Sequence, residues 1–375
     1  MNEIYSEILH LRLDHTFLSI LKEFISKVDH LISWEEFGRI PFSTSHSSPR
    51  IFLRDLYHAC ARKTYMYLSY SSTHSYLLQR LSKRACPKSR LLFSFLCLNQ
   101  QIDKSELVGV IDPGDVTHYV EAGLFLRRDS KLMLPVTLVP YRNYYYLSEA
   151  LHVGANRDLY NIQPAHIGVY THLQVVYLKQ RLKNRPIKSM LEMGCGIGVV
   201  SLEMSDTVPY IEGVELYDRN LEFARANQAL RNNTSIRFHQ SNLFYNVKSK
   251  YDLIVFAPWI PSEDSLELTK QFLQEAPSYL NEHGHIMLTL SSQCLNGNDM
   301  VLDEVIKILR KESLQASQDI ICSYYLEEEP GKRALRADYY LWIERQAKSK
   351  GSTNVLIRRN ISFKGIGFWG RRILN

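Results

Sequence analysis

One stretch near the middle of the chain constrains the fold most: residues 190–200 read Met-Leu-Glu-Met-Gly-Cys-Gly-Ile-Gly-Val-Val. A short apolar run ends in three glycines at alternate positions, and an apolar pattern with helical spacing follows. This order predicts a strand, a tight turn and a helix. Glycine lets the backbone take positive φ and lets a ligand approach the main chain closely, and a helix N-terminus offers free N–H groups and a partial positive charge. The turn is therefore predicted to bind a nucleotide-like ligand.

Two classes of ligand compete for this turn. The dinucleotide fingerprint is Gly-x-Gly-x-x-Gly, with an acidic residue about 20 positions later. Here the spacing of Gly194, Gly196 and Gly198 is Gly-x-Gly-x-Gly, so the third glycine comes one position early. Glu192 precedes the turn, and Glu215 ends the next apolar run, where it is placed to accept hydrogen bonds from ribose hydroxyls. This pattern resembles the class I S-adenosylmethionine (SAM)-dependent methyltransferases and favours SAM over NAD.

The resemblance implies cofactor contacts near several predicted strand ends. Leu216 or Tyr217 would pack on the adenine face, and Asn242 can accept a hydrogen bond from the adenine amino group through its carbonyl oxygen. A small buried residue is expected at Cys195. In such enzymes a loop before the helix that precedes the first strand, here predicted over 164–182, covers the methionine part of SAM, and this adds Thr171 as a candidate. The predicted cofactor residues are Glu192, Gly194, Cys195, Gly196, Gly198, Glu215, Leu216, Asn242, Leu243, Ala257 and Thr171.

A second motif spans residues 252–261, Asp-Leu-Ile-Val-Phe-Ala-Pro-Trp-Ile-Pro. It resembles the Asp-Leu-Ile-Val-x-Asn-Pro-Pro-(Tyr/Phe) motif of the release-factor glutamine and ribosomal-RNA guanine N-methyltransferases. In that group the Asn accepts hydrogen bonds from the target nitrogen, and the aromatic residue stacks on the planar group. Aligned without gaps, Ala257 stands at the Asn position and Trp259 replaces the second proline. The missing amide disfavours glutamine or guanine as the target. The predicted catalytic residues are Ala257, Pro258, Trp259 and the candidate general base Glu263. Asp264, Ser291 and Gln293 are alternative bases, with His239 as a runner-up.

From residue 188 onward, predicted strands and helices alternate, which implies a parallel doubly wound sheet. The predicted fold is a seven-stranded, Rossmann-like class I methyltransferase domain over residues 151–375, preceded by a mainly helical domain over residues 1–150. Strands are predicted over 188–193, 210–215, 235–239, 251–256, 284–290, 317–326 and 339–344. Helices are predicted over 164–182, 198–206, 218–231, 266–280 and 300–311.

The N-terminal domain has the element order of a winged helix. Helices are predicted over 91–99 and 105–111, a third is capped by Asp115, and a hairpin over 124–135 follows. Residues 136–148 are predicted to continue as one strand. Acidic residues around the second and third helices disfavour binding to DNA phosphates. The module is therefore predicted to cap a substrate pocket or to form a homodimer.

Composition excludes several classes of protein. The six cysteines include no Cys-x-x-Cys pair, which argues for a reducing compartment and against structural zinc. An apolar run of about 20 residues and a signal-peptide pattern are both absent from the sequence. Residues 151–190 carry 6 Lys/Arg against 1 Asp/Glu. Nucleic-acid enzymes often show such a basic stripe, but a solvated helix C-terminus also favours cations and is the preferred interpretation.

The sequence thus predicts a cytoplasmic, metal-free, SAM-dependent methyltransferase that acts on a small molecule or peptide in a biosynthetic pathway, by in-line transfer to N or O. One alternative is an N-methyltransferase of protein or RNA. Another, from a different class, is a non-catalytic SAM-binding or winged-helix regulatory protein. The intact glycine turn and Glu215 favour retained cofactor binding.

Overall fold

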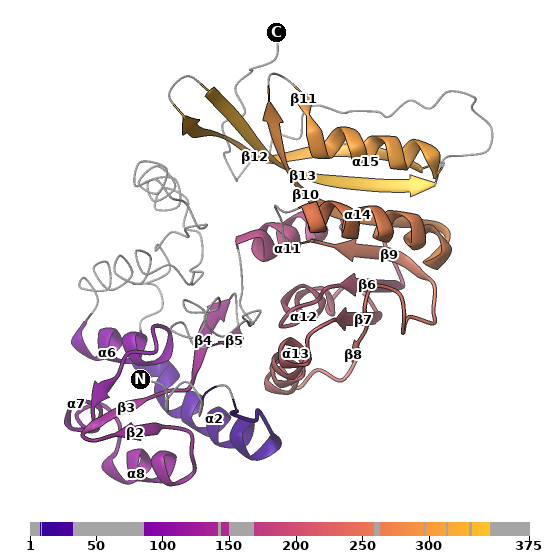
Figure 1. Cartoon of the computed structure of the whole chain (residues 1–375). Helices are drawn as coiled ribbons and strands as arrows, with labels where there is room; N and C mark the ends of the chain where they lie inside the picture. Colours follow the sequence, from indigo (N-terminus) through magenta and orange to yellow (C-terminus); the bar gives the residue numbers. More distant parts are fainter. Residues whose placement is uncertain are drawn as a thin grey trace. The chain divides into compact units, whose positions relative to one another are not determined.

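The computed structural model describes residues 8, 10–32, 86–141, 144–149, 169–258, 263–295, 298–312, 314–329 and 332–345 (Figure 1). The chain divides into two compact units. Unit 1 comprises Met1–Tyr177, Gly196–Glu203 and Tyr217–Thr234, and unit 2 comprises Leu178–Cys195, Met204–Leu216 and Ser235–Asn375. The predicted domain division at residue 150 stays a prediction.

Unit 2 contains an eight-stranded sheet. Seven strands follow the order β12-β13-β10-β9-β6-β7-β8, and the short β11 pairs with β10 outside this path. Strands β10, β9, β6, β7 and β8 are parallel to one another. The first strand, β6, lies inside the sheet and the chain winds outward to both sides, which is the predicted doubly wound arrangement. The bounds are β6 Ser189–Met193, β7 Tyr210–Glu215, β8 Ile236–Gln240, β9 Tyr251–Phe256, β10 Leu280–Leu295, β11 Asn298–Asp299, β12 Leu314–Glu329 and β13 Lys332–Arg345.

The prediction of an all-parallel sheet is wrong at one edge. Strand β13 runs antiparallel to both β10 and β12. Only residues 330 and 331 separate β12 from β13, and so short a connection can join only antiparallel strands. Strand β10 is longer than predicted because its pairing with β13 continues to Cys294, beyond Leu288, where its pairing with β9 ends.

Helices of unit 2 cover its sheet with aromatic and aliphatic side chains. Phe272 of α14 (Glu263–Glu275) packs on Phe256 and Phe244, with ring centroids 4.4 and 5.6 Å apart. Helix α15 (Met300–Lys311) buries three leucine or valine side chains at helical spacing: Leu302, Val305 and Leu309. The predicted helix 266–280 begins three residues earlier and ends in the 3₁₀ turn η2 (Ala276–Tyr279).

Unit 1 contains α2 (His15–Val28), α6 (Pro87–Leu96), α7 (Lys104–Val108) and α8 (Pro113–Glu121), and a sheet in the order β1-β3-β2. Its strands are β1 (Ile102–Asp103), β2 (Leu126–Arg128) and β3 (Lys131–Met133). Asp112, rather than the predicted Asp115, caps α8, because Asp112 Oδ1 accepts a hydrogen bond from the Gly114 N–H at 2.8 Å. Three helices and a hairpin follow one another as expected, and the winged-helix assignment itself stays a prediction.

The predicted single strand over 136–148 is wrong. The segment forms a hairpin of β4 (Val136–Tyr141) and β5 (Tyr144–Glu149), paired antiparallel. The polar residues 142 and 143 separate the two apolar runs. Unit 1 also holds α13 (Asp218–Leu230), most of α12 (Val199–Met204) and the first part of α11 (Val169–Leu182).

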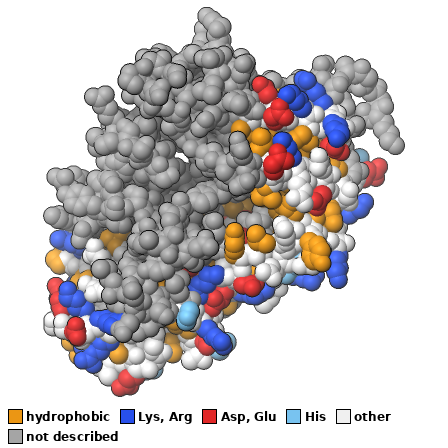
Figure 2. Space-filling model, viewed as in Figure 1, with side chains coloured by type: hydrophobic (Ala, Val, Ile, Leu, Met, Phe, Trp, Pro, Cys, Tyr) orange, Lys and Arg blue, Asp and Glu red, His pale blue; other side chains and the backbone are white. Residues whose placement is uncertain are grey.

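The described surface mixes side chains of both charges with hydrophobic ones (Figure 2). Among the described helices, none combines the length and hydropathy needed to cross a bilayer. Cytoplasmic location stays a prediction.

Candidate functional site

Most predicted cofactor residues lie along one edge of the sheet of unit 2. Strands β9, β6, β7 and β8 are adjacent and parallel, so their carboxyl ends share an edge. Ligands of open α/β sheets bind outside this edge. The structure brings the following predicted residues to it: Glu192, Gly194, Cys195, Glu215, Leu216, Asn242, Leu243, Ala257 and Pro258.

The glycine turn has the backbone that its sequence predicts. Gly194, Gly196 and Gly198 have φ angles of +67°, +54° and +79°, which L side chains rarely adopt. A Cβ at Gly196 would meet no atom within 4 Å, so space is open beside the main chain. The Cys195 N–H donates to the Val214 carbonyl at 2.9 Å, which joins the turn to β7. The turn is thus a cradle shaped for a ligand that approaches the backbone.

Cys195 packs inside unit 2. Its side chain is only 5% exposed, and it lies against Gly213 of β7, where an added Cβ would be 3.3 Å from Cys195 Cβ. The same added atom would come within 2.6 Å of the Phe238 ring. Gly213 is therefore required for close packing, and Cys195 fills the small space next to it, as expected of a small buried residue.

A buried carboxylate ends β7. The Glu215 side chain is 7% exposed, and its Oε1 accepts a hydrogen bond from the Leu216 N–H at 2.9 Å. The Glu215 carbonyl accepts from the Ser241 N–H at 3.0 Å, which fixes the β7 and β8 ends together. The next two residues, Leu216 and Tyr217, are 46% and 45% exposed. An acid beside exposed apolar side chains suits a ligand with a hydroxylated sugar and a flat ring.

The turn after β8 is strained. Leu243 has φ +44° although it is not glycine, and its side chain is buried. Ser241 Oγ donates to the Leu243 carbonyl at 2.7 Å and accepts from the Asn246 N–H at 3.0 Å. These two hydrogen bonds stabilise the conformation of the turn. Asn242, at the start of the turn, is exposed. Backbone strain of this kind gathers at functional sites.

The second motif is described as far as its first proline. At the end of β9, Phe256 and Pro258 are buried and Ala257 is exposed. Trp259 lies outside the described residues, and so does the side chain of Glu263, the first residue of α14. Thr171, in the first turn of α11, is half-buried and belongs to unit 1, and its role stays a prediction.

Asp252, the first residue of this motif, has a structural role. Its Oδ2 accepts the N–H groups of Lys188 and Ser189 at 2.8 and 3.0 Å, and its Oδ1 accepts from Asn281 Nδ2 at 2.7 Å. Although partial burial acts in the opposite direction, these hydrogen bonds lower the pKa of Asp252. Asp252 therefore links the starts of β6, β9 and β10 by hydrogen bonds. These starts lie at the edge of the sheet opposite the carboxyl ends, where the ligand is expected.

His239 also serves packing. Its Nε2 lies 3.4 Å from Glu212 Oε1, and Glu212 Oε2 accepts from the Tyr210 hydroxyl at 2.9 Å. Glu212 is only 2% exposed. The predicted runner-up base therefore lies beside a buried carboxylate within the sheet.

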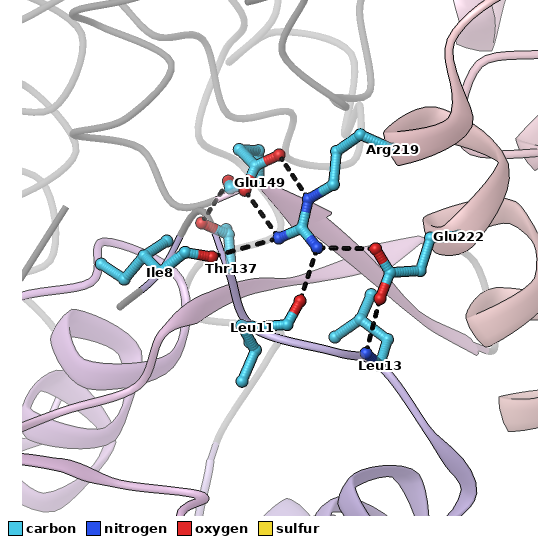
Figure 3. Close-up of polar contacts among 7 residues, drawn as sticks. All are labelled: Ile8, Leu11, Leu13, Thr137, Glu149, Arg219 and Glu222. Atoms are coloured by element: carbon cyan, nitrogen blue, oxygen red, sulfur yellow. Dashed lines mark hydrogen bonds and ion pairs between the residues drawn. The ribbon is translucent and has the colours of Figure 1, made fainter. Parts of the chain in front are cut away.

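Two polar residues of α13 were missed by the sequence predictions. Arg219 forms an ion pair with Glu149 and hydrogen bonds with residues 8 and 11 (Figure 3). Asn227, which has no exposed surface, bonds to Leu147 and to Ile197 inside the glycine turn. One feature of the sequence could have identified Asn227: it is an amide residue next to Ala224 and Ala226 on a helix face that is predicted to be apolar.

The described residues include no group of His, Cys, Asp or Glu that could hold a metal ion. The positive-φ glycines, the buried Glu215 and the exposed Leu216 fit SAM, whose parts are a charged amino acid, a ribose and an adenine. The fit rests on the shape of the cradle and on the donors and acceptors around it.

Comparisons with known proteins find methyltransferases over the part of the chain that contains this site. Residues 167–313 match the family model "Methyltransferase small domain". A putative protein N5-glutamine methyltransferase of Methanocaldococcus jannaschii is 29% identical over 136 residues, which cover 31% of this chain and 68% of the relative. A ribosomal protein L11 methyltransferase of Thermosipho africanus is 32% identical over 120 residues, 32% of this chain and 43% of the relative. A release factor glutamine methyltransferase of Haemophilus influenzae is 30% identical over 146 residues, 34% of this chain and 50% of the relative.

The chain thus spans about two thirds of the first relative and half or less of the other two. The family match covers the glycine turn, the second motif and the strands β6, β7 and β9 next to them. The prediction of a methyltransferase is confirmed, and the alternative of a non-catalytic regulatory protein is not supported. The chain carries a class I methyltransferase domain of the small-domain type, and it is an enzyme whose methyl donor is SAM.

Proposed function

We propose that this enzyme transfers the methyl group of SAM to a nitrogen atom of a protein substrate. The observation that carries the proposal is the kind of relative that the catalytic domain matches. The three relatives described above are named for protein substrates: a protein glutamine, ribosomal protein L11 and a release factor. The sequence predicted a small molecule or peptide, and the comparisons favour its protein alternative instead.

The described surface supports a protein over a nucleic acid. Lys, Arg, Asp and Glu side chains are interspersed on the described part of the face in Figure 2. Binding to a phosphate backbone calls for clustered Lys and Arg that neutralise several phosphates at once. An interspersed surface suits a protein partner better.

The end of β9 favours an amine over a carboxamide as the acceptor. Phe256, Ala257 and Pro258 carry no amide or carboxylate side chain, whereas the motif they resemble has an Asn there. A carboxamide nitrogen has two N–H donors that need acceptors in a buried site. A deprotonated amine presents a lone pair to the methyl group and depends less on such an acceptor. We therefore take the acceptor to be an amine nitrogen.

The chain's own task is to hold and orient the reactants. When bound, SAM supplies an electrophilic methyl group on a sulfonium. The glycine turn would hold the amino-acid part, Glu215 the ribose, and Leu216 the adenine face. Alignment of the nucleophile with the methyl group is worth up to roughly 7–11 kcal/mol of the barrier. An amine needs at most one general base, and Glu263 is the candidate.

The test is methyl transfer from radiolabelled SAM into fractions of a cell extract. We expect label in protein bands that protease removes and ribonuclease spares, and mass spectrometry should place a 14-dalton increase on an amine. The Glu215→Ala variant is the matched control and should lose the label. Label confined to RNA or to small molecules would contradict the proposal, and label on a glutamine side chain would contradict its choice of an amine.

A further inference from the structure

Asn227 joins three parts of unit 1. It lies on α13 and has no exposed surface. Its Oδ1 accepts the Leu147 N–H at 2.6 Å, and its Nδ2 donates to the Leu147 carbonyl at 3.1 Å and to the Ile197 carbonyl at 3.0 Å. One carboxamide therefore bonds a strand of the β4–β5 hairpin and the glycine turn at once.

The contact with Leu147 fixes the orientation of the Asn227 side chain. Leu147 pairs with Leu138 across the hairpin, and both its N–H and its carbonyl bond to Asn227. The carboxamide thus takes the place of a neighbouring strand along the outer edge of β5. Buried backbone groups without partners are costly, so this pairing holds Asn227 in one rotamer. One Nδ2 hydrogen bonds to the Leu147 carbonyl, so the other is directed at the Ile197 carbonyl.

The glycine turn needs such a contact. Ile197 lies between Gly196 and Gly198, both at positive φ, and glycine restricts its own backbone less than any other residue. The N–H groups of this turn are the ones that would meet the cofactor. A hydrogen bond to the Ile197 carbonyl restricts the peptide plane that joins Ile197 to Gly198. The affinity for the cofactor should therefore depend on Asn227.

A separate cluster holds the same hairpin to α12 and α13. The Tyr146 hydroxyl donates to Glu203 Oε1 at 2.8 Å, and Arg231 Nη1 lies 3.0 Å from the same oxygen. The Arg231 guanidinium also stacks 3.7 Å from the centre of the Tyr144 ring. Burial raises the pKa of Tyr146 well above its ordinary value, so the hydroxyl keeps its proton and remains a donor. This cluster should keep the hairpin in place when Asn227 is changed.

We propose that Asn227 is a positioning residue for the SAM site: it sets the conformation of the glycine turn by bonding the Ile197 carbonyl to the edge of β5. The proposal deepens the methyltransferase function and rests on SAM as the cofactor. It does not depend on the protein substrate proposed above. The β4–β5 hairpin is accordingly part of the cofactor-binding machinery.

The test is a calorimetric titration of the full chain with S-adenosylhomocysteine, the product of SAM, which binds without any methyl acceptor. Asn227→Asp keeps the shape and the acceptor of the side chain but loses both donated hydrogen bonds. We expect its dissociation constant to rise about ten-fold, the effect of one misplaced hydrogen-bonded contact. Asn232→Asp, the same change at an exposed position of unit 1, should leave the constant within about two-fold.

A second variant and a second readout separate positioning from stability. Asn227→Ser carries no charge and serves if Asn227→Asp fails to fold. The stoichiometry of the titration reports the folded fraction, and the melting temperature without ligand reports stability. Weaker binding by the folded fraction supports the proposal. Wild-type affinity in the folded fraction of either variant overturns it, even if the melting temperature falls, because Asn227 would then act on stability alone.

Discussion

Arg219 and Glu149 form a bidentate ion pair in unit 1, with Nη2 3.2 Å from Oε1 and Nε 3.4 Å from Oε2 (Figure 3). The Glu149 side chain is 1% exposed and that of Arg219 is 23% exposed. The pair joins the end of β5 to the first turn of α13, and Arg219 also donates to the carbonyls of Ile8 and Leu11. Burial raises the pKa of Glu149, although Arg219 opposes the shift. The segment with Ile8 and Leu11 is thereby fixed to α13 within unit 1.

Replacing Arg219 with methionine should destabilise the protein strongly. The variant would leave Glu149 buried without its guanidinium partner, a loss that typically costs about 3–5 kcal/mol. Denaturant unfolding followed by circular dichroism measures the change. Arg225→Met, at an exposed position of the same helix, is the control and should change stability by less than about 0.5 kcal/mol. Equal stability of the two variants would show that the ion pair contributes little.

Asp252→Asn should change how stability depends on pH. Hydrogen bonds place the folded pKa of Asp252 below its ordinary value of 3.8. The unfolded state then binds the proton more readily, so the stabilisation is present above 3.8 and is lost as the pH falls through the folded pKa. Thermal melts of both proteins between pH 6 and pH 2.5 should show the advantage of the wild type shrink toward the acidic end. A constant difference across this range would contradict the assigned role.

Gly213→Ala should be destabilising because its Cβ would lie 2.6 Å from the Phe238 ring. Overpacking of this kind costs about 1–3 kcal/mol. A double-mutant cycle with Phe238→Leu isolates the clash, and the second change should recover part of the loss. Additive effects of the two substitutions would mean that the ring moves aside without cost.

Local patterns predicted the methyltransferase elements well. The structure has β7, β9 and α15 at the predicted residues 210–215, 251–256 and 300–311, because apolar runs there end at polar or turn-forming residues. The three glycines also have the positive φ that their spacing suggested. Each of these features is encoded within a few neighbouring residues.

The missed features depend on residues far apart in the chain. Asn227 bonds to Leu147 across 80 positions, and Arg219 to Glu149 across 70. The spacing of apolar residues along the sequence gives no information about such distant pairs. The orientation of β13 was missed because apolar alternation is the same in parallel and antiparallel strands, and only the two-residue connection to β12 decides it. Trp259, on which the interpretation of the second motif partly rests, lies outside the described residues.

The central claim is that the glycine turn and Glu215 form the site of the methyl donor. Its most direct test is calorimetric titration with S-adenosylhomocysteine of the wild type and of Glu215→Ala, which removes the carboxylate assigned to the ribose. We predict a single site per chain in the wild type and a loss of affinity of at least about ten-fold in the variant, since hydrogen bonds to a charged group are worth about 1.5–3 kcal/mol. Wild-type protein that binds no S-adenosylhomocysteine, or a variant that binds it as tightly, would contradict the claim.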